Sequence, residues 1–366
     1  MRSDKRIFAG IWLPRSGRRI AAGLIELTGR DAQISWTVLC QRDLPLAPEL
    51  AEQWSQAIWA EALPHPVPAV RLVADSRDLV ESLLDQAGLR GDALEAVGLL
   101  VAPTAGETAP LAARLALKTG WRTVGHFAAS DIAAGGMGSC LWAYPAWEKL
   151  RDDRLSRLVV HIDALTTLVL VGSGCQADEV VAGTIGPGLC LIDHFGGDPD
   201  GAKAARGRPC QPMVNQLLGH HMFDQSLPAR IRCADLSGTY RKRVVSMAER
   251  CECTGMDLIA SLTEMSAQLV ARAARKLTER PHQVVLAGPG AENITLAGRV
   301  RELMSPSSTI AAGTVGIDAR CFPAAAAARL ASLRIDAAGV WCPSATGSIC
   351  PAELGTVFRC PAGGGR

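Results

Sequence analysis

The chain has 366 residues, of which 48% are hydrophobic and 20% charged, with a formal net charge of +2. This composition supplies a sizeable apolar core and excludes a disordered tract. Because acidic and basic residues are mixed along the chain, the sequence shows no basic segment of the kind that binds nucleic acid or an anionic membrane. The N-terminal apolar run is short and broken by Pro14, and no later run approaches a membrane span, so we expect a soluble, cytoplasmic protein.

The first third of the chain predicts a meander followed by alternating helices and strands. Three strand-like runs at 6–13, 19–27 and 32–40 are separated by short turns, which is typical of antiparallel pairing. The following runs read as a helix at 48–63, a strand at 69–75, a helix at 76–88 capped by Ser76, a strand at 94–102, a helix at 110–120 and a strand at 121–127. This order predicts a mixed sheet with helices packed on it.

The same pattern then recurs. Strand-like runs occupy 154–164, 165–174 and 177–186, a helix begins behind Pro187, and a long amphipathic helix spans 257–279. A strand at 282–290 ends in glycines, and Asn293 opens another helix. We therefore expect an α/β protein with two lobes and a ligand cleft between them, the first lobe at 1–130 plus 344–366 and the second at 131–343.

Twelve cysteines raise the question of a metal or disulfide site. Cys140, Cys190 and Cys233 lie among apolar or small residues, and the only close pair is Cys251 with Cys253, as C-x-C. Because no C-x-x-C pair occurs, we interpret the cysteines as buried, reduced thiols and predict no metal ligands among them.

Five segments carry a resemblance to a known family. They read GHFAASDIAAGGMGS (125–139), GTIGPGLCLID (183–193), VVLAGPGAENITLAGRV (284–300), VGIDARCFPAAAAARLA (315–331) and PSATGSICPAELGTVF (343–358). In order and spacing they resemble the anhydro-N-acetylmuramic acid kinases of the actin-like sugar kinase superfamily. The resemblance implies a two-lobe actin-like ATPase (ribonuclease H-like) fold, each lobe a mixed sheet flanked by helices.

The resemblance also implies a reaction. Water attacks the anomeric carbon of 1,6-anhydro-N-acetylmuramic acid while O6 takes the γ-phosphoryl group of ATP, a step of cell-wall (peptidoglycan) sugar recycling. Such chemistry needs a base, a magnesium ion and donors around the phosphates. ATP and Mg are thus the implied cofactors, and an amino sugar and a nucleotide the implied partners. A homodimer is left open as the assembly.

By the same resemblance, Asp131 matches the catalytic base, and Gly135, Gly136 and Gly138 form the sugar-side loop. The alternative is that Asp131 orders a turn and the glycines serve that turn only. The residues implied to contact the nucleotide or its phosphates are Ser16, Arg18, Gly186, Pro187, Gly188, Gly288, Gly290 and Asn293. Glycine turns before helices suit anions because backbone N–H groups face the ligand, but they also occur as plain strand-to-helix turns.

The chain departs from the family pattern at the metal and the phosphates. Arg18, Ala21 and Thr184 stand where the family carries acidic residues. Arginine does not ligate magnesium, so the metal site is compromised. Three hypotheses follow: a sugar kinase with impaired activity; a non-catalytic pseudokinase that binds a nucleotide, a phosphate ligand or a partner; and a different small-molecule kinase or hydrolase that uses Asp131. Arginines at 15, 18 and 19 favour an anion held without metal, although a solvated basic turn explains them too.

Overall fold

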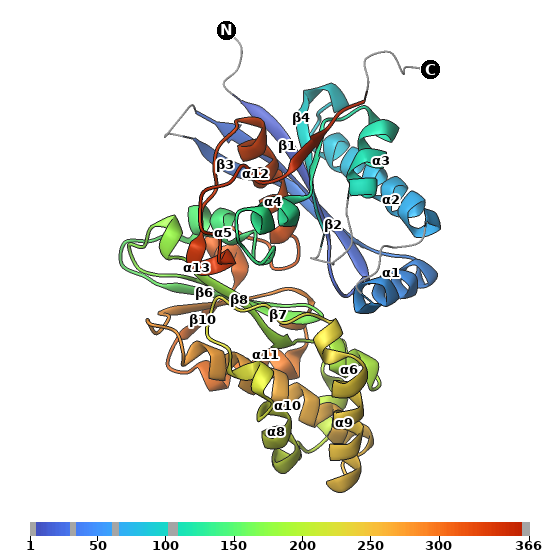
Figure 1. Cartoon of the computed structure of the whole chain (residues 1–366), viewed down its shortest axis with the longest axis vertical. Helices are drawn as coiled ribbons and strands as arrows, with labels where there is room; N and C mark the ends of the chain where they lie inside the picture. Colours follow the sequence, from blue (N-terminus) through green and yellow to red (C-terminus); the bar gives the residue numbers. More distant parts are fainter. Residues whose placement is uncertain (1–4, 30–33, 61–65, 102–108, 361–366) are drawn as a thin grey trace. The chain divides into compact units, whose positions relative to one another are not determined.

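The computed structural model describes residues 5–29, 34–60, 66–101 and 109–360, which form two α/β units (Figure 1). Unit 1 comprises Met1–Pro145, Arg320–Trp341 and Ser348–Arg366, and unit 2 comprises Ala146–Ala319 and Cys342–Gly347. These bounds differ from the predicted lobes: residues 131–145 and 320–341 belong to unit 1 rather than to the second lobe, and residues 344–347 belong to unit 2 rather than to the first.

Unit 1 is built on a six-stranded mixed sheet with the order β11-β5-β4-β1-β2-β3. Its strands are β1 (Arg6–Leu13), β2 (Arg19–Thr28), β3 (Ser35–Pro45), β4 (Leu94–Val101), β5 (Thr123–Gly125) and β11 (Thr356–Phe358). The first three pair antiparallel, which confirms the predicted meander, and β4 lies parallel to β1. The apolar residues of β1 and β2 are almost all buried, so this sheet forms the centre of the unit's core.

Helices cover both faces of this sheet (Figure 1). They are α1 (Pro48–Ala60), α2 (Pro66–Gln86), α3 (Ala109–Thr119), α4 (Phe127–Ala133) and α12 (Phe322–Ile335), whereas α5 (Ala143–Leu150) begins in unit 1 and continues into unit 2. The alanine-rich α12 lies against β1, β2 and β4 at a row of glycines. A Cβ at Gly10 would lie 1.9 Å from the Ala324 carbonyl oxygen, and one at Gly98 would lie 2.1 Å from that of Ala327. The glycines therefore allow backbone to pack on backbone, which fixes α12 in unit 1.

One predicted strand is wrong. Residues 69–75 belong to α2, which runs without a break from Pro66 to Gln86, and Ser76 lies inside this helix rather than capping it. The buried positions are Ala69, Leu72, Val73, Ser76, Leu79, Val80, Leu83 and Leu84. This spacing follows the helical period across the whole segment, and burial along one helix face outweighs the strand preference of the valines.

Unit 2 repeats the scheme with a five-stranded sheet in the order β10-β9-β6-β7-β8. Its strands are β6 (Arg157–Ile162), β7 (Leu165–Val171), β8 (Val181–Pro187), β9 (Gln283–Ala287) and β10 (Ser308–Ile310). Its helices are α6 (Cys190–His194), α7 (Ala202–Arg206), α8 (Gln211–Leu218), α9 (Gly238–Arg250), α10 (Gly255–Ala274), α11 (Ile294–Met304) and α13 (Pro343–Thr346). Strands β6, β7 and β8 form a second antiparallel meander, and β9 lies parallel to β6.

Two mixed sheets, each opened by a meander and flanked by helices, confirm the predicted fold class. Helix α10 is the long amphipathic helix expected from 257, and its buried face includes Leu262, Met265 and Leu269. Within the described ranges, the structure contains no helix that is both long enough and apolar enough to cross a membrane.

Candidate functional site

Asp131 lies in α4 of unit 1, directly before the glycine-rich loop. Its side chain is only 3% exposed. The carboxylate oxygen Oδ2 accepts a hydrogen bond from the buried N–H of Gly138 at 2.8 Å, and the Asp131 carbonyl oxygen accepts one from the Gly136 N–H at 2.9 Å. The loop therefore folds back over the carboxylate and holds it in one orientation.

The glycines of this loop have separate reasons to be glycine. A Cβ at Gly136 would lie 2.2 Å from Asp131 Oδ2, so a side chain there would displace the carboxylate. Gly135 and Gly138 adopt φ values of 85° and 65°, in the left-handed region that favours glycine. The role of a catalytic base and the role of ordering the turn are thus compatible for Asp131. The same carboxylate holds the loop and is held by it in one orientation.

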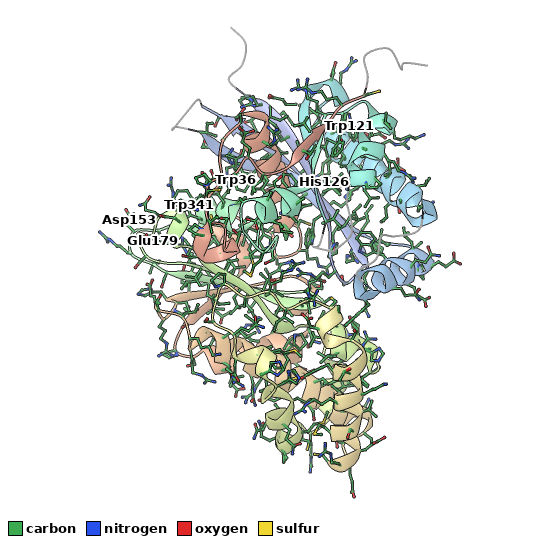
Figure 2. The ribbon with its side chains drawn as sticks, viewed as in Figure 1. Trp36, Trp121, His126, Asp153, Glu179 and Trp341 are labelled. Atoms are coloured by element: carbon green, nitrogen blue, oxygen red, sulfur yellow. The ribbon has the colours of Figure 1, made fainter. Side chains whose placement is uncertain are left out.

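The helix that carries Asp131 begins in an unusual way. His126 precedes α4 with φ 62°, and its ring packs edge-on against Phe358 at 5.6 Å between ring centres. Figure 2 labels His126 at this point of unit 1. Ser130, in the same helix, accepts a hydrogen bond at its hydroxyl oxygen from the Gly355 N–H at 2.9 Å. These contacts anchor α4 to the C-terminal segment of the chain.

The turn from β1 to β2 carries Ser16 and Arg18. Ser16 is half-buried and Arg18 is exposed. The backbone of this turn is held at Pro14. The Pro14 carbonyl oxygen accepts hydrogen bonds from the Gly17 N–H at 3.2 Å and from the Trp54 indole N–H at 3.0 Å. These hydrogen bonds fix the backbone of the turn that carries Arg18.

The third arginine of this region has a different role. Arg19 is paired with the carboxylate of Asp43, which also receives a hydrogen bond from Arg320 Nη1 at 3.2 Å. The two cations neutralise Asp43 and tie β2, β3 and the start of α12 together. Arg19 is thus paired with a carboxylate of the protein.

In unit 2, both predicted phosphate turns close on the hairpin between β6 and β7. A Cβ at Gly188 would lie 2.3 Å from the Asp163 carbonyl oxygen. A Cβ at Gly288 would lie 2.5 Å from the Ile162 carbonyl oxygen, and one at Gly290 would lie 2.3 Å from Ile162 Cγ2. The hairpin and the two glycine turns therefore form one closely packed backbone cluster.

This packing uses the N–H groups expected to face an anion. The Gly188 and Cys190 N–H groups donate to the Ala164 carbonyl oxygen at 3.0 and 3.1 Å, and the Leu189 N–H donates to that of Asp163 at 2.8 Å. The Gly288 N–H donates to the Ala319 carbonyl oxygen at 2.6 Å. These donors serve the protein, because buried backbone groups must be paired.

Asn293 is the predicted helix cap. Its side chain is fully buried, its Oδ1 accepts from the Leu296 N–H at 2.9 Å, and its Nδ2 donates to the Asp198 carbonyl oxygen at 2.6 Å. Both ends of the amide are engaged within the protein, so the contact to a nucleotide expected from the resemblance would have to break one of these bonds.

A polar row crosses the otherwise apolar sheet of unit 2. His161 on β6 pairs in register with Thr167 on β7, and Thr167 pairs with Thr184 on β8. All three are buried, and the two threonine hydroxyls lie 3.3 Å apart. Residues directly opposite across neighbouring strands share a sheet face, so this row lines one side of the sheet.

One further residue, Arg230, is joined to this row through its backbone. Arg230, in the irregular segment before α9, forms an isolated parallel bridge with Thr184. The Thr184 N–H donates to the Ala229 carbonyl oxygen at 2.8 Å, and the Ile231 N–H donates to that of Thr184 at 3.1 Å. The backbone of an arginine is thus paired with Thr184, the position where the resemblance implies an acidic residue. No local pattern around Arg230 could have indicated this, since a tertiary contact creates the bridge.

The residues at the implied metal positions do not fit a magnesium ion held by carboxylates. Arg18 is a cation, and Ala21 has only a buried methyl group. The Thr184 hydroxyl is hydrogen-bonded to the Thr167 hydroxyl at 3.3 Å. Magnesium prefers oxygen ligands that include carboxylates. Nor do the described residues contain a group of three or more His, Cys, Asp or Glu side chains suited to a metal ion.

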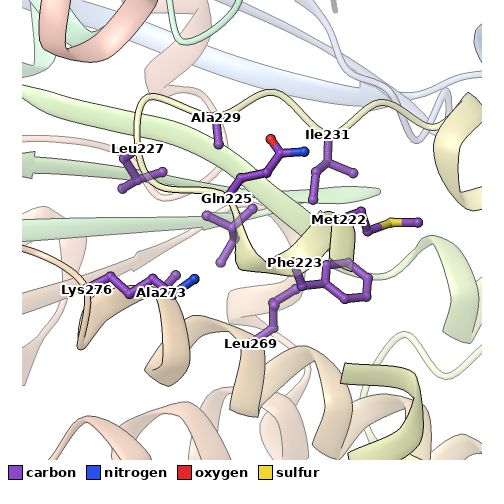
Figure 3. Close-up of a pocket in the computed structure, with 10 residues that line it drawn as sticks. Met222, Phe223, Gln225, Leu227, Ala229, Ile231, Leu269, Ala273 and Lys276 are labelled. Carbon is purple, nitrogen blue, oxygen red and sulfur yellow. The ribbon is translucent and has the colours of Figure 1, made fainter. Parts of the chain in front are cut away.

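A cavity in unit 2 is too small to be the substrate site. It lies between α10 and the segment 222–231, and its lining includes Phe223, Leu227 and Leu269 (Figure 3). Its volume is about 20 Å³, which is room for about one water molecule. The prediction of buried thiols is correct for six cysteines, among them Cys190, whose pKa is raised by burial. It is wrong for the other six, because five are half-buried and Cys350 is exposed.

Comparisons with known proteins identify the family. Residues 71–360 match the family model described as anhydro-N-acetylmuramic acid kinase. Anhydro-N-acetylmuramic acid kinase of Gloeobacter violaceus is 29% identical, covering 93% of this chain and 94% of its own length, and that of Cyanothece sp. is 26% identical, covering 93% and 96%. Among solved structures, a ROK family glucokinase from Streptomyces griseus, in complex with glucose and AMPPNP, matches with a TM-score of 0.40 and 14% identity, over 88% of this chain and 98% of its own. The chain belongs to the anhydro-N-acetylmuramic acid kinase family.

Proposed function

We propose that the chain is an ATP-dependent anhydro-N-acetylmuramic acid kinase whose phosphoryl transfer is impaired. The observation that carries the proposal is the fixed, buried carboxylate of Asp131, with its Oδ2 held 2.8 Å from the Gly138 N–H. A general base works best when its orientation is set before the substrate arrives. Membership of the family supports the proposed substrate class and the proposed use of ATP.

In the proposed reaction, Asp131 takes a proton from a water molecule as that water attacks the anomeric carbon. The bond from the anomeric carbon to O6 breaks, and O6 takes the γ-phosphoryl group of ATP, leaving ADP. Arg18 and the turn that contains Ser16 are the proposed contacts for the phosphates. The Gly188 and Gly288 N–H groups are not among them, because they already donate to carbonyl oxygens within unit 2. Losing one such contact typically lowers the rate by about 10²-fold or more, so changes at Arg18, Ala21 and Thr184 predict slow turnover.

The test is formation of the 6-phosphate sugar, followed by mass spectrometry with the anhydro sugar, ATP and magnesium. We expect product from the unmodified chain and at least about a hundredfold less from Asp131→Asn, which keeps the side-chain shape and removes the base. Asp153→Asn, at an exposed carboxylate of unit 2, is the matched control and should leave the rate unchanged. Equal rates for Asp131→Asn and the unmodified chain would remove Asp131 from the mechanism.

A second candidate function is a pseudokinase that binds a nucleotide or phosphate ligand without transferring it. The exposed Arg18 on the β1–β2 turn favours it. Arginine binds phosphate oxygens through two parallel hydrogen bonds and needs no metal. This candidate predicts that ATP binds equally well in EDTA and in magnesium.

Thermal unfolding with ATP in EDTA tests this candidate. At a ligand concentration of 100 times the dissociation constant, binding should stabilise the folded chain by about 2.7 kcal/mol. The stabilisation should fall in Arg18→Ala and persist in Arg90→Ala, an exposed arginine of the same unit. Stabilisation that requires magnesium would count against metal-independent binding.

A further inference from the structure

Residues 348–358, which we call the C-terminal segment, are bonded to α4 on both sides of Asp131. On one side, the Gly355 N–H donates to the Ser130 hydroxyl oxygen at 2.9 Å. On the other, the Ile349 N–H donates to the carbonyl oxygen of Ala134, the residue that ends the helix, at 2.9 Å. Asp131 lies between these two attachments, so the place of its carboxylate depends on a segment that is distant in the sequence.

Helix α4 needs this support. It has seven residues, and a helix of that length has little stability without tertiary contacts. His126, directly before it, has φ 62°, a conformation that a residue other than glycine keeps only when its surroundings impose it. The ring of Phe358, the last residue of β11, packs edge-on against the His126 ring. The Ser130 hydroxyl donates to the His126 carbonyl oxygen at 3.4 Å. One hydroxyl group thus bonds both the C-terminal segment and the start of its own helix.

The C-terminal segment is itself fixed at Gly355. The Gly355 carbonyl oxygen accepts from Arg334 Nε, near the end of α12, at 2.8 Å, and Arg334 Nη1 pairs with the Glu353 carboxylate at 2.9 Å. Gly355 has φ 99°, and a Cβ there would lie 2.8 Å from Val124 Cγ1 and 3.0 Å from Phe127 Cδ1. The contacts of this glycine therefore connect α12 and β5 to α4.

We propose that Ser130 is a positioning residue for Asp131, which it holds in place by tying α4 to the C-terminal segment. The inference rests on the proposed function, in which the Asp131 carboxylate is the base. The Gly138 N–H donates to that carboxylate at 2.8 Å, so a shift of α4 relative to the glycine-rich loop alters this bond. A misplacement of about 1 Å lowers the rate of a positioned catalytic group by up to about a hundredfold.

Two substitutions at Ser130 test the hydroxyl group. Ser130→Ala removes both the acceptor of the Gly355 N–H and the donor to the His126 carbonyl oxygen. Ser130→Thr keeps a hydroxyl that can make both bonds, since threonine in a helix bonds the carbonyl four residues earlier as serine does. Arg334→Ala removes the other bond of Gly355 and leaves Ser130 unchanged, so it tests the same support from a second point.

The first readout is hydrogen exchange at the Gly138 amide, which needs no substrate. Ser130→Ala should accelerate this exchange by about tenfold, because one hydrogen bond changes a local opening equilibrium by about that factor. Arg334→Ala should also accelerate it, whereas Ser130→Thr should exchange as the unmodified chain does. Ser226→Ala, at an exposed serine of unit 2, is the matched control and should change nothing.

The Val97 amide separates local loosening from general destabilisation. It lies in β4 and donates to the Arg122 carbonyl oxygen at 2.8 Å. Its exchange should keep the same rate in every variant. Unchanged exchange at Gly138 in Ser130→Ala overturns the proposal, and so does an equal acceleration at Val97.

The second readout is turnover with the anhydro sugar, ATP and magnesium. Ser130→Ala should lower kcat by at least about tenfold and leave both KM values unchanged, because the orientation of a base acts in the transition state. Ser130→Thr should restore kcat. A change in KM at constant kcat, or a fall in kcat that threonine does not restore, overturns the proposal. If the unmodified chain gives no product while Ser130→Ala accelerates exchange at Gly138, the proposed function fails and the positioning of Asp131 stands.

Discussion

Asp131 should contribute to stability as well as to catalysis, and two substitutions separate the contributions. The bond from the Gly138 N–H to Oδ2 is 2.8 Å long, and both groups are buried. A hydrogen bond to a charged group contributes about 1.5–3 kcal/mol, and a buried donor left without an acceptor costs about 1–3 kcal/mol. Asp131→Ala removes the acceptor, so we expect a loss of about 2–3 kcal/mol in the free energy of unfolding.

Asp131→Asn keeps an amide oxygen in the same place and should lose about 1 kcal/mol or less. Urea unfolding followed by tryptophan fluorescence measures both values, and hydrogen exchange at the Gly138 amide reports the loop directly. Exchange should accelerate in Asp131→Ala and change little in Asp131→Asn. Asp153→Ala, which alters an exposed carboxylate, is the control and should stay within about 0.5 kcal/mol of the unmodified chain. Equal stability of the Ala and Asn variants, with unchanged Gly138 exchange, would refute the structural role.

Three further predictions concern unit 2. Asn293→Ala removes the cap of α11 and the donor to the Asp198 carbonyl oxygen, and should lower the unfolding free energy by about 2–3 kcal/mol in urea; a loss below about 0.5 kcal/mol contradicts this. Gly288→Ala places a Cβ 2.5 Å from the Ile162 carbonyl oxygen at φ 79°. It should lose about 2 kcal/mol or more by the same assay, and an unchanged midpoint refutes the close packing. Burial, His221 and Arg243 lower the pKa of His220 from its ordinary 6.5, so the unfolded chain binds the proton first and stability falls as the pH drops below about 6.5. His220→Gln should flatten that part of a pH series of urea midpoints, and an unaltered slope excludes His220 as a cause.

The meanders and most helices could be predicted because their signals are local. The runs at 6–13 and 19–27 are short apolar stretches separated by a turn, and both form strands. Asn293 caps the start of α11, as its short polar side chain predicts. The segment 69–75 misled because its valines favour strands, whereas the burial period of α2 shows only when the whole segment is read together. The short strands β10 and β11 were not expected, since each has three residues and exists by pairing with a distant strand.

The candidate site was harder to predict because the partners of its residues are distant in sequence. Asp131 and its glycines were recognised, but the bond to Gly138 required the folded loop. The N–H groups of Gly188 and Gly288 looked available to an anion, and the structure shows that carbonyl groups of the protein accept from them. Arg230 joins the row at Thr184 only through a tertiary bridge. The local sequence therefore shows which residue types are present. It does not show which N–H groups already donate hydrogen bonds to other parts of the protein.

Coupling between ring opening and phosphoryl transfer tests the proposed function most directly. In a single turnover, with the protein in excess over the anhydro sugar and with ATP and magnesium present, the new reducing end and the 6-phosphate are measured in the same samples. We expect the reducing end and the 6-phosphate to form at the same slow rate and in equal amounts. Both should nearly vanish in Asp131→Asn. Hydrolysis of ATP without ring opening, or ring opening in Asp131→Asn at the rate of the unmodified chain, would contradict it.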